Sequence, residues 1–292
     1  MRKEFRNLLK GLAFISPWII GFLIFQLYPI YKSVYYSFCE YDVLNPPIFI
    51  GLENYNSLLH DELFLKSIIN TIIYASMAIP LGLVVSLFFA ILLNQKIIGR
   101  AIFRTIYFLP SLVPMVALAI LWKWIFNGEH GILNYILELF GIPGPNWLGS
   151  TIWATPSIVL TGVWGVGGSI VIYLAALQDV PGNLYEAAEI DGAGWFKKVW
   201  YITLPMISPV IYFNLILGII GCLQVFTIPY IMTAGGPARS TYYYTMYLFD
   251  NAFSFLKMGY ASAMAVLLFL IIVAITIITT KLTESRVYYA GK

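Results

Sequence analysis

Charge is scarce in this chain of 292 residues. Asp, Glu, Lys and Arg together make up 11% of it, whereas hydrophobic residues make up 60%. A soluble globular domain carries about 25% charged and about 45–50% apolar residues. A water-soluble fold, a disordered chain and a small disulfide scaffold are therefore excluded, and a lipid bilayer is the expected solvent.

Cysteine and histidine are almost missing as well. Cys39 and Cys222 lie far apart in the sequence, as do His60 and His130, and none of them has a partner at metal-ligand spacing. The sequence favours two free thiols over a disulfide, and it shows no Ser-His-Asp or Cys-His arrangement. We therefore expect no catalytic residue and no metal ligand in this chain.

Long apolar runs are what the chain has in abundance. The hydrocarbon core of a bilayer is about 30 Å thick, and roughly 20 helical residues cross it. The first run is too long for a signal peptide and lacks a small-residue cleavage site, so we expect a retained helix there. The prediction is an all-α, polytopic membrane protein with six transmembrane helices, near Leu12–Ser37, Ile68–Leu93, Ile102–Phe126, Ile152–Leu177, Leu204–Tyr230 and Gly259–Thr280.

Basic residues set the orientation of these spans, because cytoplasmic loops carry an excess of Lys and Arg. They gather before the first span, between the second and third, between the fourth and fifth, and after the sixth, whereas most acidic residues fall on the opposite side. Both termini are therefore expected in the cytoplasm. The residues that carry this argument are Arg2, Lys3, Arg6, Lys10, Lys96, Arg100, Arg104, Lys197, Lys198, Lys281, Arg286 and Lys292.

One membrane domain follows from this layout. It covers residues 12–280, between a basic cytoplasmic tail at 1–11 and a cytoplasmic tail at 281–292. A cytoplasmic loop at 178–203 joins the fourth and fifth spans. The three outer connections, each too short for a separate folded domain, lie near 39–67, 127–151 and 231–258.

No energy source is visible in the sequence. The middle of every span lacks Asp, Glu and His, which lowers the odds of a proton-driven carrier but leaves sodium coupling through broken helices open. The glycine-rich run at 162–168 lacks the Gly-Lys-Ser/Thr ending of a phosphate-binding loop. Close helix packing explains these glycines most simply, with a lining of the permeation path as the alternative. The sequence indicates a passage whose motor lies on another protein.

A short cytoplasmic helix is predicted between the fourth and fifth spans, over Leu184–Ile190. Asn183 is the expected N-cap, which would put Glu186 in the first turn near the positive end of the helix dipole. Gly192 can adopt the left-handed conformation that ends a helix and reverses the chain.

This helix is too short to be stable alone, because isolated helices below about 12 residues are marginal. Its apolar residues, Leu184, Ala187, Ala188 and Ile190, must therefore dock against something. On physical grounds a groove in a cytoplasmic partner and the membrane surface are equally good docking places.

A resemblance decides between them. Glu186-Ala187-Ala188, then Gly192, then Ile202 and Leu204-Pro205 resemble the "EAA" signature of permease subunits of ATP-binding-cassette (ABC) importers, at the spacing of that signature. The version here resembles the carbohydrate-importer branch. Further segments resemble the first permease of the maltose, glycerol-phosphate and lactose type of pair: Ser16-Pro17-Trp18, Leu27-Tyr28-Pro29, Phe108-Leu109-Pro110 with Pro114, and Thr233-Ala234-Gly235-Gly236-Pro237.

The resemblance implies a type I ABC importer permease fold in the bacterial cytoplasmic membrane, with lipid around it and no nucleic acid. Its partners would be a second homologous permease, two copies of a cytoplasmic ABC ATPase and an extracytoplasmic solute-binding protein that delivers a sugar. The ATPase would use ATP and Mg²⁺, and this chain would bind no cofactor and would not be an enzyme itself. The residues that would couple it to the ATPase are Glu186, Ala187, Ala188, Asp191 and Gly192.

The sugar path is expected in the fourth to sixth spans, where the resemblance places it. Sugars favour aromatic faces together with hydrogen-bonding groups, and Pro229 would free backbone groups nearby. Helix packing is the alternative role for each of these side chains. The candidate path residues are Trp164, Ser169, Gln224, Phe226, Thr227 and Tyr230.

Two other charged residues have competing roles, and the chain has two competing functions. Lys123 is expected to extend toward lipid headgroups rather than to touch an anionic sugar, and Arg239 is expected to be solvated rather than to contact the binding protein. A secondary transporter and a membrane-embedded enzyme are the competing functions, and the missing intramembrane carboxylates and catalytic pairs disfavour them. Which sugar is carried does not follow from the sequence.

Overall fold

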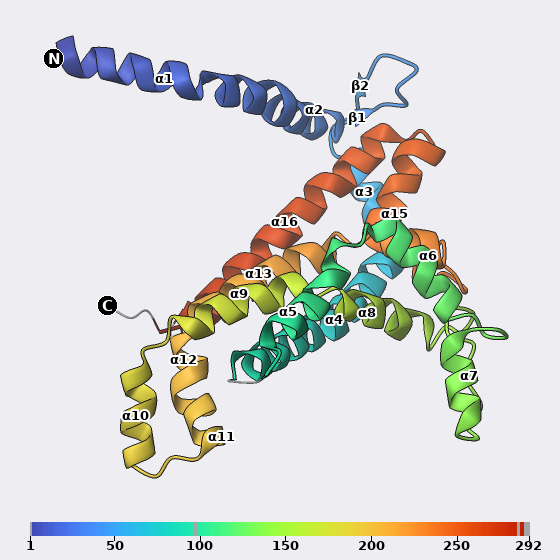
Figure 1. The fold of residues 1–292 in the computed structure, drawn as a ribbon. Helices are drawn as coiled ribbons and strands as arrows, with labels where there is room; N and C mark the ends of the chain where they lie inside the picture. Colours follow the sequence, from blue (N-terminus) through green and yellow to red (C-terminus); the bar gives the residue numbers. More distant parts are fainter. Residues whose placement is uncertain (1, 96–97, 285–286, 289–292) are drawn as a thin grey trace. The chain divides into compact units, whose positions relative to one another are not determined.

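The computed structural model describes residues 2–95, 98–284 and 287–288. Lys96, Arg286 and Lys292, on which the orientation argument partly depends, lie outside the described residues. The described chain is helical apart from one two-stranded antiparallel ribbon (Figure 1). It divides into two compact units, Met1–Phe64 with Leu248–Ile271, and Leu65–Tyr247 with Ile272–Lys292.

The first unit opens with a long helical run and continues into a small polar region. Its apolar stretch has none of its residues buried within the chain. The elements are α1 (Arg2–Phe22), a π-helical turn η1 (Leu23–Leu27), α2 (Tyr28–Tyr36), β1 (Cys39–Glu40), β2 (Ile48–Phe49), α3 (Glu53–Leu59), the first residues of α4 (Glu62–Asn94), the π-helical turn η4 (Asp250–Ser254) and the first half of α16 (Met258–Thr283).

Asn54 holds this polar region together. Its buried amide Nδ2 donates to the carbonyls of Ser37 and Cys39 at 3.0 and 2.9 Å, which fixes the end of α2 against α3. A Cβ at Gly259 would clash with the Cys39 carbonyl, so only glycine lets α16 start so close to β1. The sequence pattern carried no sign of this arrangement, because no helix or strand period relates Asn54 to Ser37 and Cys39, and Gly259 lies more than 200 positions from Cys39.

The second unit contains the rest of α4 and α16 and the helices between them, except η4 and the last two residues of α15. Buried residues of α4 and α9 form one core cluster with Ile207, and buried residues of α4, α8 and α15 form another. Its further elements are α5 (Arg100–Phe108), the 3₁₀ turn η2 (Leu109–Leu112), α6 (Met115–Ile125), α7 (Ile132–Leu139), α8 (Ala154–Trp164), α9 (Gly167–Gln178), α10 (Gly182–Ile190), α11 (Trp195–Lys198), the π-helical turn η3 (Val199–Thr203), α12 (Leu204–Met206), α13 (Ser208–Leu223), α14 (Thr227–Met232) and α15 (Tyr244–Phe249).

The predicted all-α membrane fold is confirmed, with a difference in two spans. Four stretches of the described chain are long and apolar enough to cross a bilayer, and the predicted third and fourth spans are bent pairs of helices. The bend is 98° between Arg100–Leu112 and Met115–Ile125, and 48° between Ala154–Trp164 and Gly167–Gln178. The four stretches without such a bend are Leu9–Tyr36, Glu62–Asn94, Ser208–Met232 and Met258–Thr283.

Proline and glycine explain the two bends. Val113 precedes Pro114 and adopts an extended conformation (φ −72°, ψ 127°), as a residue before proline prefers. The second bend falls in the glycine-rich run, at Gly165 and Val166. A Cβ on Gly167 would clash with the backbone of Tyr107 and Phe108 in the neighbouring α5 segment, so this glycine serves the close packing that the sequence favoured.

Candidate functional site

The predicted cytoplasmic loop forms a helical hairpin. Figure 1 shows α10 beside the arm made of α11 and α12, which leads into α13. Two side-chain contacts join α10 to this arm: the hydroxyl of Tyr185 lies 2.9 Å from Oγ1 of Thr203, and Nζ of Lys198 lies 2.8 Å from Oε1 of Glu189. The hairpin therefore has internal contacts at two levels and is more than a loop carrying one short helix.

The turn of this hairpin is a Schellman motif. Gly192 adopts the left-handed conformation, with φ +74°. Its N–H donates to the Glu189 carbonyl at 3.0 Å, and the N–H of Ala193 donates to the Ala188 carbonyl at 2.8 Å. The predicted role of Gly192 in ending the helix and reversing the chain is confirmed by this geometry.

The start of α10 differs from the prediction. The helix begins at Gly182 with Pro181 as its N-cap residue, so Asn183 is the second helical residue and not the cap. The first turn consequently contains no acidic residue, and Glu186 falls in the second turn. The helix starts two residues earlier than predicted, and Pro181 suits this position because its φ of −59° is fixed near the helical value and its ring leaves no N–H to satisfy.

Most of the apolar residues of α10 are exposed in this chain, so their predicted docking against a partner stays a prediction. Ala188 is half-buried, whereas Leu184 and Ala187 are exposed and Ile190 is 88% exposed. Among the residues predicted to couple to the ATPase, Glu186, Ala187, Asp191 and Gly192 are exposed. The exposed surface that α10 offers to a partner therefore includes Leu184, Ala187 and Ile190, whereas Ala188 is half-buried.

The carboxylate of Glu189 is held in its charged form. The hydrogen bond from Lys198, followed by the charge of that ammonium group, lowers the pKa of Glu189 below its ordinary value of 4.5. The side chain of Lys198 is only 20% exposed, whereas that of Glu189 is 66% exposed. The pair is therefore formed at neutral pH and lies on the arm side of α10.

A cavity of about 190 Å³ lies among α4, α8, α9 and α13. Of the six predicted path residues, only Ser169 lines it. Reading the sequence missed the polar side chains of Asn214 and Ser86, although a polar residue within an apolar span was a usable signal. The full lining is Tyr74, Ala78, Ile79, Gly82, Leu83, Ser86, Val159, Gly162, Val163, Val166, Ser169, Asn214, Gly218 and Cys222.

The other predicted path residues lie elsewhere in the second unit. Phe226 and Tyr230 stack on each other with their ring centroids 5.1 Å apart, next to Thr227 at the start of α14. Gln224 is exposed and caps the end of α13. Trp164, 44% exposed, meets the edge of Trp122 at 6.0 Å. The structure therefore does not gather the six residues around one cavity.

The predicted fifth span is broken between α13 and α14, and Pro229, which was expected to free backbone groups, lies in the first turn of α14. Proline lacks the N–H that would bind the carbonyl of Val225, four residues earlier. The hydroxyl of Thr245 donates to that carbonyl instead. The freed backbone group is thus used inside the protein.

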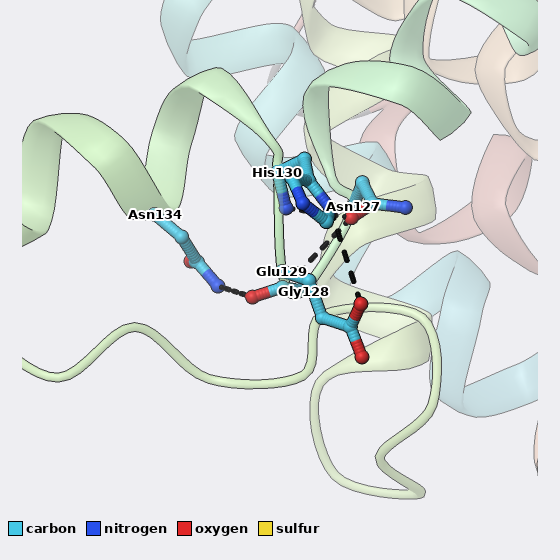
Figure 2. Close-up of polar contacts among 5 residues, drawn as sticks. All are labelled: Asn127, Gly128, Glu129, His130 and Asn134. Atoms are coloured by element: carbon cyan, nitrogen blue, oxygen red, sulfur yellow. Dashed lines mark hydrogen bonds and ion pairs between the residues drawn. The ribbon is translucent and has the colours of Figure 1, made fainter.

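The connection near 127–151 is held by internal hydrogen bonds and contains a recess of about 740 Å³. Figure 2 shows its frame, in which Asn134 Nδ2 donates to the Gly128 carbonyl at 2.8 Å. Oδ1 of Asn127 accepts the N–H groups of Glu129 and His130 at 3.0 and 2.8 Å. His130 also lies 3.9 Å from the Glu129 carboxylate. No group of three or more metal-binding side chains occurs in the described parts of the chain.

The connection near 231–258 contacts Lys123 and Asn70 and contains Arg239. Nζ of Lys123 lies 3.4 Å from the Ile231 carbonyl at the end of α14, so this lysine contacts protein as well as lying at a helix end. Arg239 is exposed, as expected, while its carbonyl accepts Nδ2 of Asn70 at 2.8 Å. Lys66 donates to the neighbouring Ala238 carbonyl at 2.9 Å.

Comparison with solved structures supports this fold. A chain in a crystal structure of a bacterial alginate ABC transporter, in complex with an alginate pentasaccharide-bound periplasmic protein, superposes with a TM-score of 0.87. The two chains are 22% identical, and the match covers 98% of this chain and 97% of the other. This likeness bears on the fold alone, and it agrees with the predicted permease fold.

Comparison of sequences is more specific. The probable ABC transporter permease protein YesP of Bacillus subtilis is 40% identical over 97% of this chain and 93% of its own length. The sulfoquinovosyl glycerol transport system permease protein SmoG of Agrobacterium fabrum is 34% identical over 95% and 91%. The trehalose/maltose transport system permease protein MalF of Thermococcus litoralis is 34% identical over 97% and 96%.

A family assignment follows from these matches. Residues 78–288 match the family described as "Binding-protein-dependent transport system inner membrane component". The relatives named above are permease proteins and not enzymes, and together with the apolar helices they make this chain a multi-pass membrane protein. The chain therefore belongs to this family, as a permease of the carbohydrate-type ABC importers that the motif at Glu186–Pro205 resembles.

Proposed function

We propose that this chain forms, with a second homologous permease subunit, the membrane path of a binding-protein-dependent importer for a sugar or oligosaccharide. The names of its relatives support the substrate class, because SmoG and MalF are named for sulfoquinovosyl glycerol and for trehalose and maltose. The single observation that carries the coupling mechanism is the braced hairpin with an exposed outer face on α10.

In this mechanism α10 seats in a cleft of one copy of a separate ATPase. Glu186 supplies polar contacts, exposed Ala187 permits close approach, and Gly192 makes the exit turn with Asp191 before it. Ala188 takes part by letting α10 lie close to its own arm. ATP and Mg²⁺ belong to the ATPase, of which two copies act, one on each permease. Closure of the ATPase pair moves both hairpins and switches the membrane path from inward-open to outward-open.

The orientation proposed is the one that the basic residues favour. Both termini and the hairpin face the cytoplasm of a bacterial cell, and the connections near 39–67, 127–151 and 231–258 face outward. An extracytoplasmic solute-binding protein delivers the sugar to the outer side. The alginate transporter with its periplasmic protein is a solved example of a related fold in such a complex.

The sugar path is proposed to run along the fourth and fifth spans. Ser169 lines the cavity among α4, α8, α9 and α13, and Tyr230 of α14 stacks on Phe226. Gln224, Thr227 and Trp164 complete the candidate set. Transport kinetics of Gln224→Ala test this assignment, because unchanged apparent affinity and rate would count against substrate contact.

Reconstitution tests the whole proposal. The chain is co-expressed with the second permease, the ATPase and the binding protein encoded nearest to it, and sugar uptake into vesicles is measured with and without vanadate. We expect uptake that requires ATP, is blocked by vanadate, and is accompanied by cross-linking between a cysteine at Ala187 and the ATPase. Uptake that persists without the ATPase would instead support a secondary transporter.

A further inference from the structure

Two residues of α10 outside the signature motif face the hairpin's other arm. Tyr185 and Glu189 are four residues apart, so they lie one above the other on the same side of the helix. Tyr185 contacts Thr203 at the root of the hairpin, and Glu189 contacts Lys198 nearer its tip. Because α10 is held to the other arm at two separate levels, these contacts fix its orientation relative to that arm as well as its position.

The contact at the root involves a buried hydroxyl. Thr203 has 5% of its surface exposed, and its hydroxyl lies 3.3 Å from the Lys198 carbonyl, which can only accept. The hydroxyls of Tyr185 and Thr203 lie 2.9 Å apart and either of them can donate, so each side chain has a hydrogen-bond partner here. Thr203 is followed directly by Leu204, the first residue of α12, so Tyr185 is bound to the segment that leads into α13.

The contact at the tip is an ion pair. Lys198 is the last residue of α11, and its ammonium group lies 2.8 Å from Oε1 of Glu189. Beyond it the chain reverses through Gly192, whose Schellman hydrogen bonds join the end of α10 to the turn. Without these contacts, a helix of nine residues has little stability of its own and would swing on residues 191–194.

The outer face of α10 is left free by this arrangement. Glu186, Ala187 and Ile190 are exposed, whereas Tyr185 and Ala188 are half-buried. One face of the helix thus serves the hairpin and the opposite face is open to a partner. A force applied to the open face of α10 is transmitted to α13 only if the contacts between α10 and the other arm stay formed.

We propose that Tyr185 and Glu189 are positioning residues for energy coupling. Acting through Thr203 and Lys198, they lock α10 to the arm of α13, so that the ATPase moves the transmembrane helix and not only the short helix it holds. This inference rests on the proposed function, since it assumes that α10 is the element the ATPase grips.

A charge exchange tests the ion pair in the complete transporter, reconstituted with its ATPase, second permease and binding protein. The variants are Glu189→Lys, Lys198→Glu and the double exchange, and the readout is solute moved per ATP hydrolysed. We expect each single variant to lower this ratio about fivefold and the double exchange to restore it to within about twofold of the unchanged protein. The ATPase should co-purify equally with all of them.

Two outcomes would overturn the proposal. One is a normal ratio in both single variants. The other is a double exchange that stays as low as the single variants, because the residues would then act separately and not as a pair. Failure of the proposed function looks different, since the unchanged chain would itself give no cross-link from Ala187 to the ATPase and no ATP-dependent uptake.

Tyr185 is tested by matched conservative changes. Tyr185→Phe and Thr203→Val each remove one hydroxyl of the bond, and we expect each to lower the ratio by about fivefold. Thr203→Ser keeps the hydroxyl and should behave like the unchanged protein. A loss in Thr203→Ser as large as that in Thr203→Val would show that the methyl group, and not the hydrogen bond, matters.

The distance between the two arms of the hairpin can be measured directly, including in variants that fail to transport for other reasons. Spin labels at exposed positions Asn183 and Trp200, one on each arm, are placed in the full chain with Cys39 and Cys222 replaced by alanine. The proposal expects one narrow distance distribution, broadened in Lys198→Glu and narrow again in the double exchange. Equal widths in all three proteins would overturn it.

Discussion

The hydroxyl of Thr245 donates to the carbonyl of Val225, the group that Pro229 leaves without a helical partner. The two residues are 20 positions apart, and the bond lets α13 end and α14 begin without an unsatisfied carbonyl at the break. The end of the fifth span is thereby fixed by a side chain from the connection that follows it.

Thr245→Val removes this donor while keeping the shape of the side chain. We expect a loss of about 1–3 kcal/mol, because the Val225 carbonyl is left without a partner in an apolar setting. Thr245→Ser is the matched control and should keep most of the stability. Thermal unfolding of the purified protein in one detergent compares the three, and equal melting temperatures would refute the assignment.

Gly167→Ala is expected to weaken the packing of α9 on α5. The added Cβ would meet the backbone of Tyr107 and Phe108, which cannot move aside as a flexible side chain would. Overpacking of this kind costs about 1–3 kcal/mol. A Cβ on the neighbouring Gly168 would meet only open space, so Gly168→Ala is the control and should unfold at the temperature of the unchanged protein.

Gly192→Ala and Gly192→Pro separate strain from loss of the turn. The left-handed conformation costs alanine about 1–2 kcal/mol, but alanine keeps its N–H. Proline cannot reach a φ of +74° and removes the N–H that donates to Glu189, so the turn is lost. We expect reduced transport with alanine and none with proline, while both chains still insert into the membrane. Normal uptake by the proline variant would contradict the role given to this turn.

Tryptophan at the two alanines of α10 tests which face meets the partner. Ala187 is exposed, so Ala187→Trp should block binding of the ATPase and leave the hairpin intact. Ala188 is half-buried, so Ala188→Trp should disturb the hairpin itself. Co-purification of the ATPase and the spin-label distance between the arms distinguish the two effects.

The braced hairpin should depend on pH in one direction. The pKa of Glu189 is lowered in the folded chain by Lys198, so the pair stabilises the hairpin above the pKa of an unfolded glutamate. That stabilisation is lost as the pH falls through the lowered value, below 4.5. Distances between labels at Asn183 and Trp200 should therefore stay constant from neutral pH to about pH 5 and broaden below the ordinary glutamate pKa. In Glu189→Gln they should show no such change.

Two thiols that the sequence presents as equals differ in the structure. Cys222 lines the cavity among α4, α8, α9 and α13, whereas Cys39 is fully buried. A small thiol reagent should therefore modify one cysteine per chain, and Cys222→Ser should abolish the modification. Labelling of Cys39 in the folded protein would contradict the packing around Asn54.

The sequence determined the solvent, the helices and the location of the coupling segment. Apolar runs of about 20 residues leave a backbone no alternative to helix in lipid, and the fixed spacing from Glu186 to Pro205 identifies the loop without any contact being known. Gly192 was predictable for the same reason, since a left-handed helix end is a local property. The positions of the bends after Leu112 and Trp164 follow from local prolines and glycines, whereas the angles of the bends do not follow from them.

Tertiary structure decided which residues meet. The pairs Tyr185 with Thr203, Glu189 with Lys198, and Thr245 with Val225 join positions 9 to 20 residues apart, and no periodic pattern encodes such pairings. Asn214 and Ser86 line the same cavity as Ser169, whereas Gln224 and Trp164 do not. The packing of four helices decides which side chains line it. The sequence alone predicts where each helix lies and how apolar it is. Which side of a helix contacts its neighbours depends on how the side chains of all the helices pack together.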